Sequence, residues 1–133
     1  MQINRRKVRN GVSCFLNYLK FRYLGVEMGY HFRGLGKIVL KLDPKYKRVV
    51  IGDNFIIIGG GFRNSISRNM MSCIHVQAGA ELCIGNDVRM SDVCIWARKK
   101  IIIGSFVTVG ADTIIMDSDS HPLRSEERRV GKE

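Results

Sequence analysis

A six-residue repeat in the second half of the chain constrains its fold more than any other feature. One series is Ala78-Gly79, Ile84-Gly85 and Met90; a second is Ile103-Gly104, Val109-Gly110, Ile115 and His121, and Ile51-Gly52 begins the same pattern earlier. The two series are offset by one residue, which a bulge within positions 96–100 would absorb. A short strand and a turn every six residues predict a three-sided coil of about 18 residues, with the aliphatic side chain pointing inward.

Stacked coils of this kind give an all-β protein, a left-handed parallel β-helix of hexapeptide-repeat coils. Each coil pairs with the coils on either side, so open strand edges remain only at the two ends. The left hand is an expectation, because the period itself does not fix handedness and it departs from the usual right-handed crossover. We expect this β-helix to occupy residues 31–123, with a short helical segment before it.

Residues 1–30 are expected to form a short basic amphipathic helix. Its apolar side chains recur near helical spacing: Val12, Phe15, Leu16, Tyr18, Leu19 and Tyr23. Gly25 and Gly29 then interrupt the pattern. Such a helix can dock on its own domain, which we expect, or lie on an anionic membrane as a peripheral contact. Nucleic acid is not an expected partner, because no recognition motif accompanies the basic residues.

Positive charge is concentrated at the N-terminal end. Residues 1–50 contain twelve Lys and Arg against Glu27 and Asp43, a net charge of +10, whereas residues 51–123 contain six against seven, a net charge of −1. No apolar stretch approaches the ~20 residues that span a bilayer. No secretory signal is recognisable either, so we expect a cytoplasmic protein.

Cysteine and histidine placement argues against disulfides and metal centres. Cys14, Cys73, Cys83 and Cys94 form no CxxC pair, which favours free buried thiols. His31, His75 and His121 are far apart in sequence, so we expect no metal site.

The segment from Ile84 to Leu123, "IGNDVRMSDVCIWARKKIIIGSFVTVGADTIIMDSDSHPL", resembles the hexapeptide-repeat acyltransferases. It is most similar to the galactoside and maltose acetyltransferases and to the O-acetyltransferases of capsular and exopolysaccharide synthesis. The resemblance implies acetyl-CoA as co-substrate, a sugar or glycan-precursor acceptor, and a homotrimer that holds CoA between subunits. It also implies that His121 is the general base that removes a proton from the acceptor hydroxyl, a role that suits an imidazole near neutral pH.

Four further residues are candidates for substrate binding. Asp117 and Asp119 could orient His121 or bind the sugar, or they could be ordinary turn-capping aspartates. Galactoside acetyltransferases carry an active-site Asn whose place is taken here by Ser91, followed by Asp92, which puts galactoside itself in doubt as the acceptor. The segment "FRNSISRN" at 62–69 is similar to an upstream loop of polysaccharide acetyltransferases, and its arginines could meet an acidic glycan.

Two other functions fit the same sequence. The acceptor could be the amino group of an amino-sugar nucleotide, which would make the protein an N-acetyltransferase. Alternatively, the β-helix could be a non-catalytic scaffold whose basic helix binds a membrane or a partner.

The last ten residues, 124–133, break the repeat at once. Their sequence, "RSEERRVGKE", is the translation of a common short-read sequencing adapter. We therefore expect a non-native tail, a natural chain that continues past Leu123 with further coils, and a fragment that is inactive alone because most of the CoA site is missing.

Overall fold

The computed structural model describes residues 5–60 and 71–118. One α-helix, α1 (Arg5–Tyr23), precedes the strands of the described chain. The strands are β1 (Glu27–Met28), β2 (Arg33–Gly36), β3 (Ile38–Leu42), β4 (Arg48–Ile51), β5 (Ile56–Gly59), β6 (Ser72–Val76), β7 (Glu81–Ile84), β8 (Arg89–Ser91), β9 (Cys94–Ala97), β10 (Lys100–Ile103), β11 (Thr108–Val109) and β12 (Ile114–Met116).

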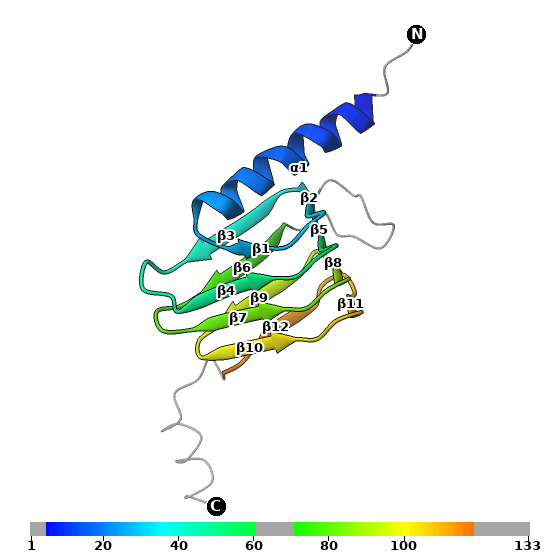
Figure 1. Cartoon of the computed structure of the whole chain (residues 1–133). Helices are drawn as coiled ribbons and strands as arrows, with labels where there is room; N and C mark the ends of the chain where they lie inside the picture. Colours follow the sequence, from blue (N-terminus) through cyan, green and yellow to red (C-terminus); the bar gives the residue numbers. More distant parts are fainter. Residues whose placement is uncertain (1–4, 61–70, 119–133) are drawn as a thin grey trace, which may run out of the picture.

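The strands form three parallel sheets of four strands each. Sheet 1 is β1-β4-β7-β10, sheet 2 is β2-β5-β8-β11 and sheet 3 is β3-β6-β9-β12. The chain visits the three sheets in turn, so each circuit adds one strand to each sheet (Figure 1). This arrangement confirms the expected all-β architecture of parallel strands wound around one core.

The strand register differs from a strict 18-residue coil. Ile84 pairs with Ile103 and Met90 with Val109, steps of 19 residues, while the step from Ile95 to Ile115 is 20. The one-residue offset between the two repeat series is therefore observed as a step of 19 residues, and the described strands show no coil of 18 residues. Strands of sheet 1 and sheet 2 are always joined by four residues, at 29–32, 52–55, 85–88 and 104–107. The other connections vary in length, which lengthens the circuits.

The prediction is wrong for one member of the repeat, Ala78-Gly79. Ala78 and Gly79 lie in an exposed turn, and the chain turns inward only at Ala80, which is completely buried. The physical reason is the variable connection from sheet 3 to sheet 1, which spans 43–47, 77–80 and 98–99 in successive circuits. A fixed six-residue spacing cannot follow a turn whose length changes from one circuit to the next.

A hydrogen-bonded ladder explains the Ile-Gly-polar pattern at the constant corner between sheets 1 and 2. The backbone N–H of Tyr30 donates to Oδ1 of Asp53 at 2.8 Å, and the N–H of Asp53 donates to Oδ1 of Asn86 at 2.8 Å. The N–H of Asn86 in turn donates to Oγ of Ser105 at 2.9 Å. A Cβ on Gly85, just before this position, would lie 2.7 Å from the Ser105 nitrogen, so the ladder requires glycine there.

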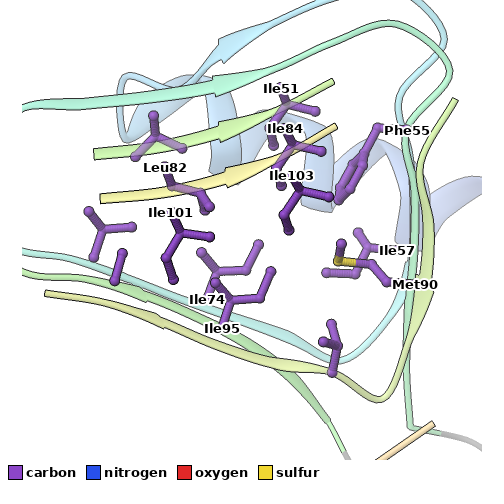
Figure 2. Packing of buried hydrophobic residues seen from close by; sticks show 14 of the residues in the cluster. Ile51, Phe55, Ile57, Ile74, Leu82, Ile84, Met90, Ile95, Ile101 and Ile103 are labelled. Carbon is purple, nitrogen blue, oxygen red and sulfur yellow. The ribbon is translucent and has the colours of Figure 1, made fainter. Parts of the chain in front are cut away.

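The core is a column of aliphatic side chains inside the three sheets. Leu82, Ile84, Ile101 and Ile103 point inward from sheet 1 toward side chains of the other two sheets (Figure 2). Strands such as β7 alternate half-buried and buried residues, as expected when one face of a sheet covers a core. Because every circuit contributes to the same column, the core is continuous from the first coil to the last.

Helix α1 covers the N-terminal end of this column (Figure 1). Phe21 is only 1% exposed and its ring lies 4.9 Å from that of Phe32, which in turn stacks on Phe55 at 6.0 Å. Nδ2 of Asn17 donates to the carbonyl oxygens of Gly34 at 2.8 Å and Gly36 at 3.1 Å. The helix therefore satisfies backbone groups of the edge strand β2, which would otherwise be open to pairing.

The sequence predicted the helix and its docking, but the apolar row that identified the helix is not its docked face. Ser13, Asn17 and Phe21 face the coils, whereas Phe15 and Leu19 are exposed. The reason lies in the surface that α1 covers. The open strand edge presents backbone N–H and C=O groups, which Ser13 and Asn17 bind, while Phe21 packs against the ring of Phe32. Of the apolar row, the ring of Tyr18 lies 6.2 Å from that of Phe32, and the other members are left on the outside.

A glycine ends the helix. Gly25 adopts φ +88°, its N–H donates to the carbonyl of Arg22, and the N–H of Val26 donates to the carbonyl of Phe21. These two bonds form a Schellman motif, in which the left-handed residue favours glycine. The chain then enters β1 at Glu27, which pairs with β4. The β-structure thus begins a few residues before position 31.

Candidate functional site

Two of the predicted site residues, His121 and Asp119, lie outside the described residues, as does the segment at 62–69. The structure describes the chain up to Ser118, so it includes the beginning of the "DSDSHPL" segment at Asp117. The roles of His121 and Asp119 stay predictions. Ser91, Asp92 and Asp117 can be placed.

Asp117 follows β12 and holds the turn between β9 and β10. Its carboxylate accepts three backbone hydrogen bonds, from the N–H groups of Arg98 at 2.8 Å, Lys99 at 2.7 Å and Lys100 at 2.6 Å. Burial alone would raise the pKa of Asp117, but these backbone donors favour the charged form and the net effect lowers the pKa. The carboxylate is thus ionised at neutral pH and its two oxygens are engaged with backbone, which fixes the start of the segment that leads to His121.

Ser91 and Asp92 lie together at the end of β8, and both are buried. Asp92 adopts φ +47°, and its Oδ1 accepts a hydrogen bond from the N–H of Gly60 at 3.1 Å. Its backbone is bonded on both sides, by its N–H to Ile58 and by its carbonyl to Asp112. Oδ2 of Asp92 is buried and has no hydrogen-bond partner among residues 5–60 and 71–118, although a buried carboxylate oxygen normally has one. Asp92 therefore has an acceptor available at the corner where the chain leaves sheet 2.

The structure does not bring Asp117 close to Ser91 and Asp92 within one chain. Asp92 stacks on Asp112 at the corner between sheets 2 and 3, whereas Asp117 lies at the corner between sheets 3 and 1. Strand β12 runs between the two corners, which places them about 15 Å apart at the usual rise of an extended chain.

The outer face of sheet 2 carries a groove that the sequence did not predict. It has a volume of about 410 Å³ and is lined by Arg33, Leu35, Ile56, Ile58, Arg89, Met90, Ser91, Thr108, Val109 and Gly110. A polar pocket of about 350 Å³ adjoins it and shares Arg33, Ile56 and Arg89 with it, adding His31, Asn54 and Asp87. The groove connects Ser91 to two guanidinium groups. Arg33 and Arg89 are the first residues of β2 and β8, and only the strand register reveals that both pair with Ile56.

The outer face of sheet 3 carries aromatic and thiol side chains. The rings of His75 and Trp96 stack 5.9 Å apart, with the guanidinium of Arg98 5.6 Å from the Trp96 ring centre. All four cysteines are free, and Cys73 pairs with Cys94 across neighbouring strands. Burial, and next the neighbouring Cys94 thiol, raise the pKa of Cys73. A raised pKa disfavours the reactive thiolate, which makes Cys73 a poor nucleophile.

Within residues 5–60 and 71–118, no group of His, Cys, Asp or Glu side chains is arranged to hold a metal ion. Nor does this part of the chain contain a helix with the length and hydrophobicity to cross a bilayer. Comparison with protein-family models, curated proteins and solved structures finds no match to this chain.

Proposed function

We propose that the natural protein is an acetyl-CoA-dependent acyltransferase of the hexapeptide-repeat type, with these coils as the N-terminal part of a left-handed β-helix. The observation that carries the proposal is the segment from Ile84 to Leu123, which ends in Asp-Ser-Asp-Ser-His-Pro-Leu directly after β12. Asp117, the first aspartate of this ending, accepts hydrogen bonds from the backbone of the turn between β9 and β10. These bonds support the proposal because they hold the start of the ending at one corner of the coil. The three parallel sheets give the scaffold that such a loop requires.

In the proposed reaction, the imidazole of His121 accepts the proton of an acceptor hydroxyl as that oxygen attacks the thioester carbonyl carbon of acetyl-CoA. The tetrahedral oxyanion then collapses, the C–S bond breaks, and the leaving thiolate takes up the proton from the imidazolium. No covalent enzyme intermediate is needed. General base catalysis of this kind contributes about 10²–10⁴-fold to the rate.

The groove on sheet 2 favours an acceptor that carries an acidic group. Arg33 and Arg89 flank Ile56 on one face, and Ser91 lines the same groove. Guanidinium groups bind phosphate and carboxylate with paired, charge-assisted hydrogen bonds. We therefore propose a sugar of a surface-glycan precursor, bearing phosphate or a carboxylate, as the acceptor class. The O-acetyl product distinguishes this enzyme from an N-acetyltransferase acting on an amino sugar.

The test is CoA-dependent transfer by the full-length natural protein, compared between two histidine variants. His121→Ala should lower kcat by about 10²-fold or more. His75→Ala is the matched control, because His75 stacks on Trp96 at the outer face of sheet 3 and lies outside the groove. Equal activity of the His121→Ala variant and the unmodified protein would contradict the proposal and favour a scaffold function.

The acidic acceptor is tested separately. Arg33→Ala and Arg89→Ala should raise KM for a phosphorylated or carboxylated acceptor more than KM for its neutral analogue, because each variant removes one guanidinium from the groove. An equal change for both acceptors would show that the groove does not read the acidic group.

A further inference from the structure

Helix α1 has an outer ridge of exposed apolar side chains beside its docked face, and Leu16 at the edge of this ridge also lines the groove between α1 and β3. The ridge consists of Val12, Phe15, Leu16, Leu19 and Tyr23, each between 45% and 88% exposed. Their spacing of three, four, seven and eleven residues from Val12 makes one continuous stripe on a helix. In Figure 1, α1 lies across the end of the stack, with the strands on one side of it only. Contiguous exposed apolar surface of this kind marks an interaction site, unlike single scattered residues.

The ridge is not needed to hold α1 in place. The docked face uses Ser13, Asn17, Lys20 and Phe21, which make the contacts to the first coil, whereas the ridge residues are largely exposed. A helix that only capped the coils would be expected to expose polar side chains to water. The apolar ridge therefore serves a second contact, which the docked face does not explain.

The charge around the ridge indicates what covers it. The sequence of α1 contains six Lys and Arg and no acidic residue. The first coil adds three exposed cations, Arg33, Lys37 and Lys41, of which Lys37 lines the groove beside the helix. Residues 1–50 together have a net charge of +10. A second copy of the chain packed ridge to ridge would bring two such ends together, and this like-charge contact is unfavourable.

We propose that the outer ridge inserts into the surface of an anionic lipid bilayer, with α1 lying in the plane of the interface. Apolar stripes flanked by Lys and Arg bind such surfaces through buried apolar area combined with attraction to acidic headgroups. Since α1 caps one end of the stack, the coils would extend away from the bilayer (Figure 1). The groove on sheet 2 would stay at the side. The inference does not depend on the proposed acyl transfer.

The experiment is flotation of the purified full chain with lipid vesicles. One set is phosphatidylcholine alone and the other is phosphatidylcholine mixed with phosphatidylglycerol. The chain should float with the anionic vesicles, and raising NaCl from about 0.1 M to about 0.5 M should weaken its binding about tenfold or more, because salt screens exposed charge. This measurement needs no variant.

A pair of variants tests the ridge itself. Phe15→Glu combined with Leu19→Glu should weaken binding to anionic vesicles at least about tenfold, because two apolar anchors become charged. Ile102→Glu is the control: Ile102 is 66% exposed on β10, at the other end of the stack, and its replacement should leave binding unchanged. Circular dichroism of each variant verifies that the coils are folded.

Three results would overturn the proposal. The first is failure to float with anionic vesicles, and the second is equal binding to both vesicle types. The third is a dimer or larger assembly in gel filtration that the ridge variant converts to monomer without any effect on lipid binding. That result would make the ridge an interface between copies of the chain.

Discussion

Replacing Asn17 by leucine should destabilise the protein although it adds hydrophobic surface. The two side chains have the same number and branching of heavy atoms, but leucine cannot donate to the carbonyl oxygens of Gly34 and Gly36, which Asn17 bonds at 2.8 and 3.1 Å. The Gly34 carbonyl would lose this partner, whereas the Gly36 carbonyl would keep the Ser13 hydroxyl at 3.5 Å. A buried carbonyl without a partner costs about 1–3 kcal/mol, so we expect a net loss of about 1–3 kcal/mol.

The neighbouring residue supplies the matched control. Leu16 is exposed on the outer ridge, so Leu16→Asn should cost less than about 1 kcal/mol, mainly through lower helix propensity. Urea unfolding followed by circular dichroism gives both values. Hydrogen exchange at the Gly36 amide, which donates to Oγ of Ser13 at 2.7 Å, locates the loss at the helix cap.

A more damaging Leu16→Asn and a harmless Asn17→Leu would refute this account of the cap. That outcome would mean that α1 docks through its apolar row and that the polar face is solvated. The apolar residues would then face the coils, and the inference of a lipid contact through the outer ridge would be wrong as well.

Other predictions concern the corners of the coil and its last edge. Asp117→Asn should lower the free energy of unfolding most near neutral pH. The pKa of Asp117 is lowered in the folded protein, so its carboxylate stabilises the fold above the unfolded pKa and loses this effect as the pH falls through the lowered value. Urea midpoints measured across a pH series test this. Gly59→Ala should lower the free energy of unfolding in urea by several kcal/mol, because the added Cβ would overlap the Lys37 carbonyl. Gly104→Ala has open space around its Cβ and should lower it by less than about 1 kcal/mol, so equal losses would contradict this prediction. Phe106→Asn should raise the midpoint of thermal unfolding by relieving about 1 kcal/mol of left-handed strain at φ +61°, and an unchanged midpoint would argue against that strain. A protein of residues 1–123 should show no CoA-dependent transfer and should associate with increasing concentration in sedimentation, through the edges of the last coil; transfer by this fragment would contradict the expectation.

The sequence predicted the core well where the turn length is constant. Ile84, Met90, Ile103 and Val109 were expected to point inward, and all four are buried. They flank the corner between sheets 1 and 2, where four residues always join the strands and the polar ladder holds each turn. The prediction for Ala78 was wrong because the connection between sheets 3 and 1 changes length, and a repeat read from spacing alone cannot detect that.

The docked side of α1 and the groove on sheet 2 could not be predicted from one sequence. The helical spacing of Phe15 and Leu19 predicts an apolar face but not the side on which the helix docks, which is decided by the backbone groups at the open strand edge. Arg33 and Arg89 are far apart in sequence, and only the pairing of β2 and β8 with β5 brings them to one groove. The capping role of Asp117 was one of two predicted alternatives, and the structure shows three backbone bonds to its carboxylate.

The central claim is that these coils are the first part of a longer acyltransferase. Long-read sequencing of the source DNA across the codon for Leu123 tests this claim most directly. We predict that the natural reading frame continues from "DSDSHPL" into further Ile-Gly-x-Asn repeats in place of "RSEERRVGKE". A natural frame that ends in those ten residues would contradict the claim, because the chain would then lack the coils expected to hold CoA.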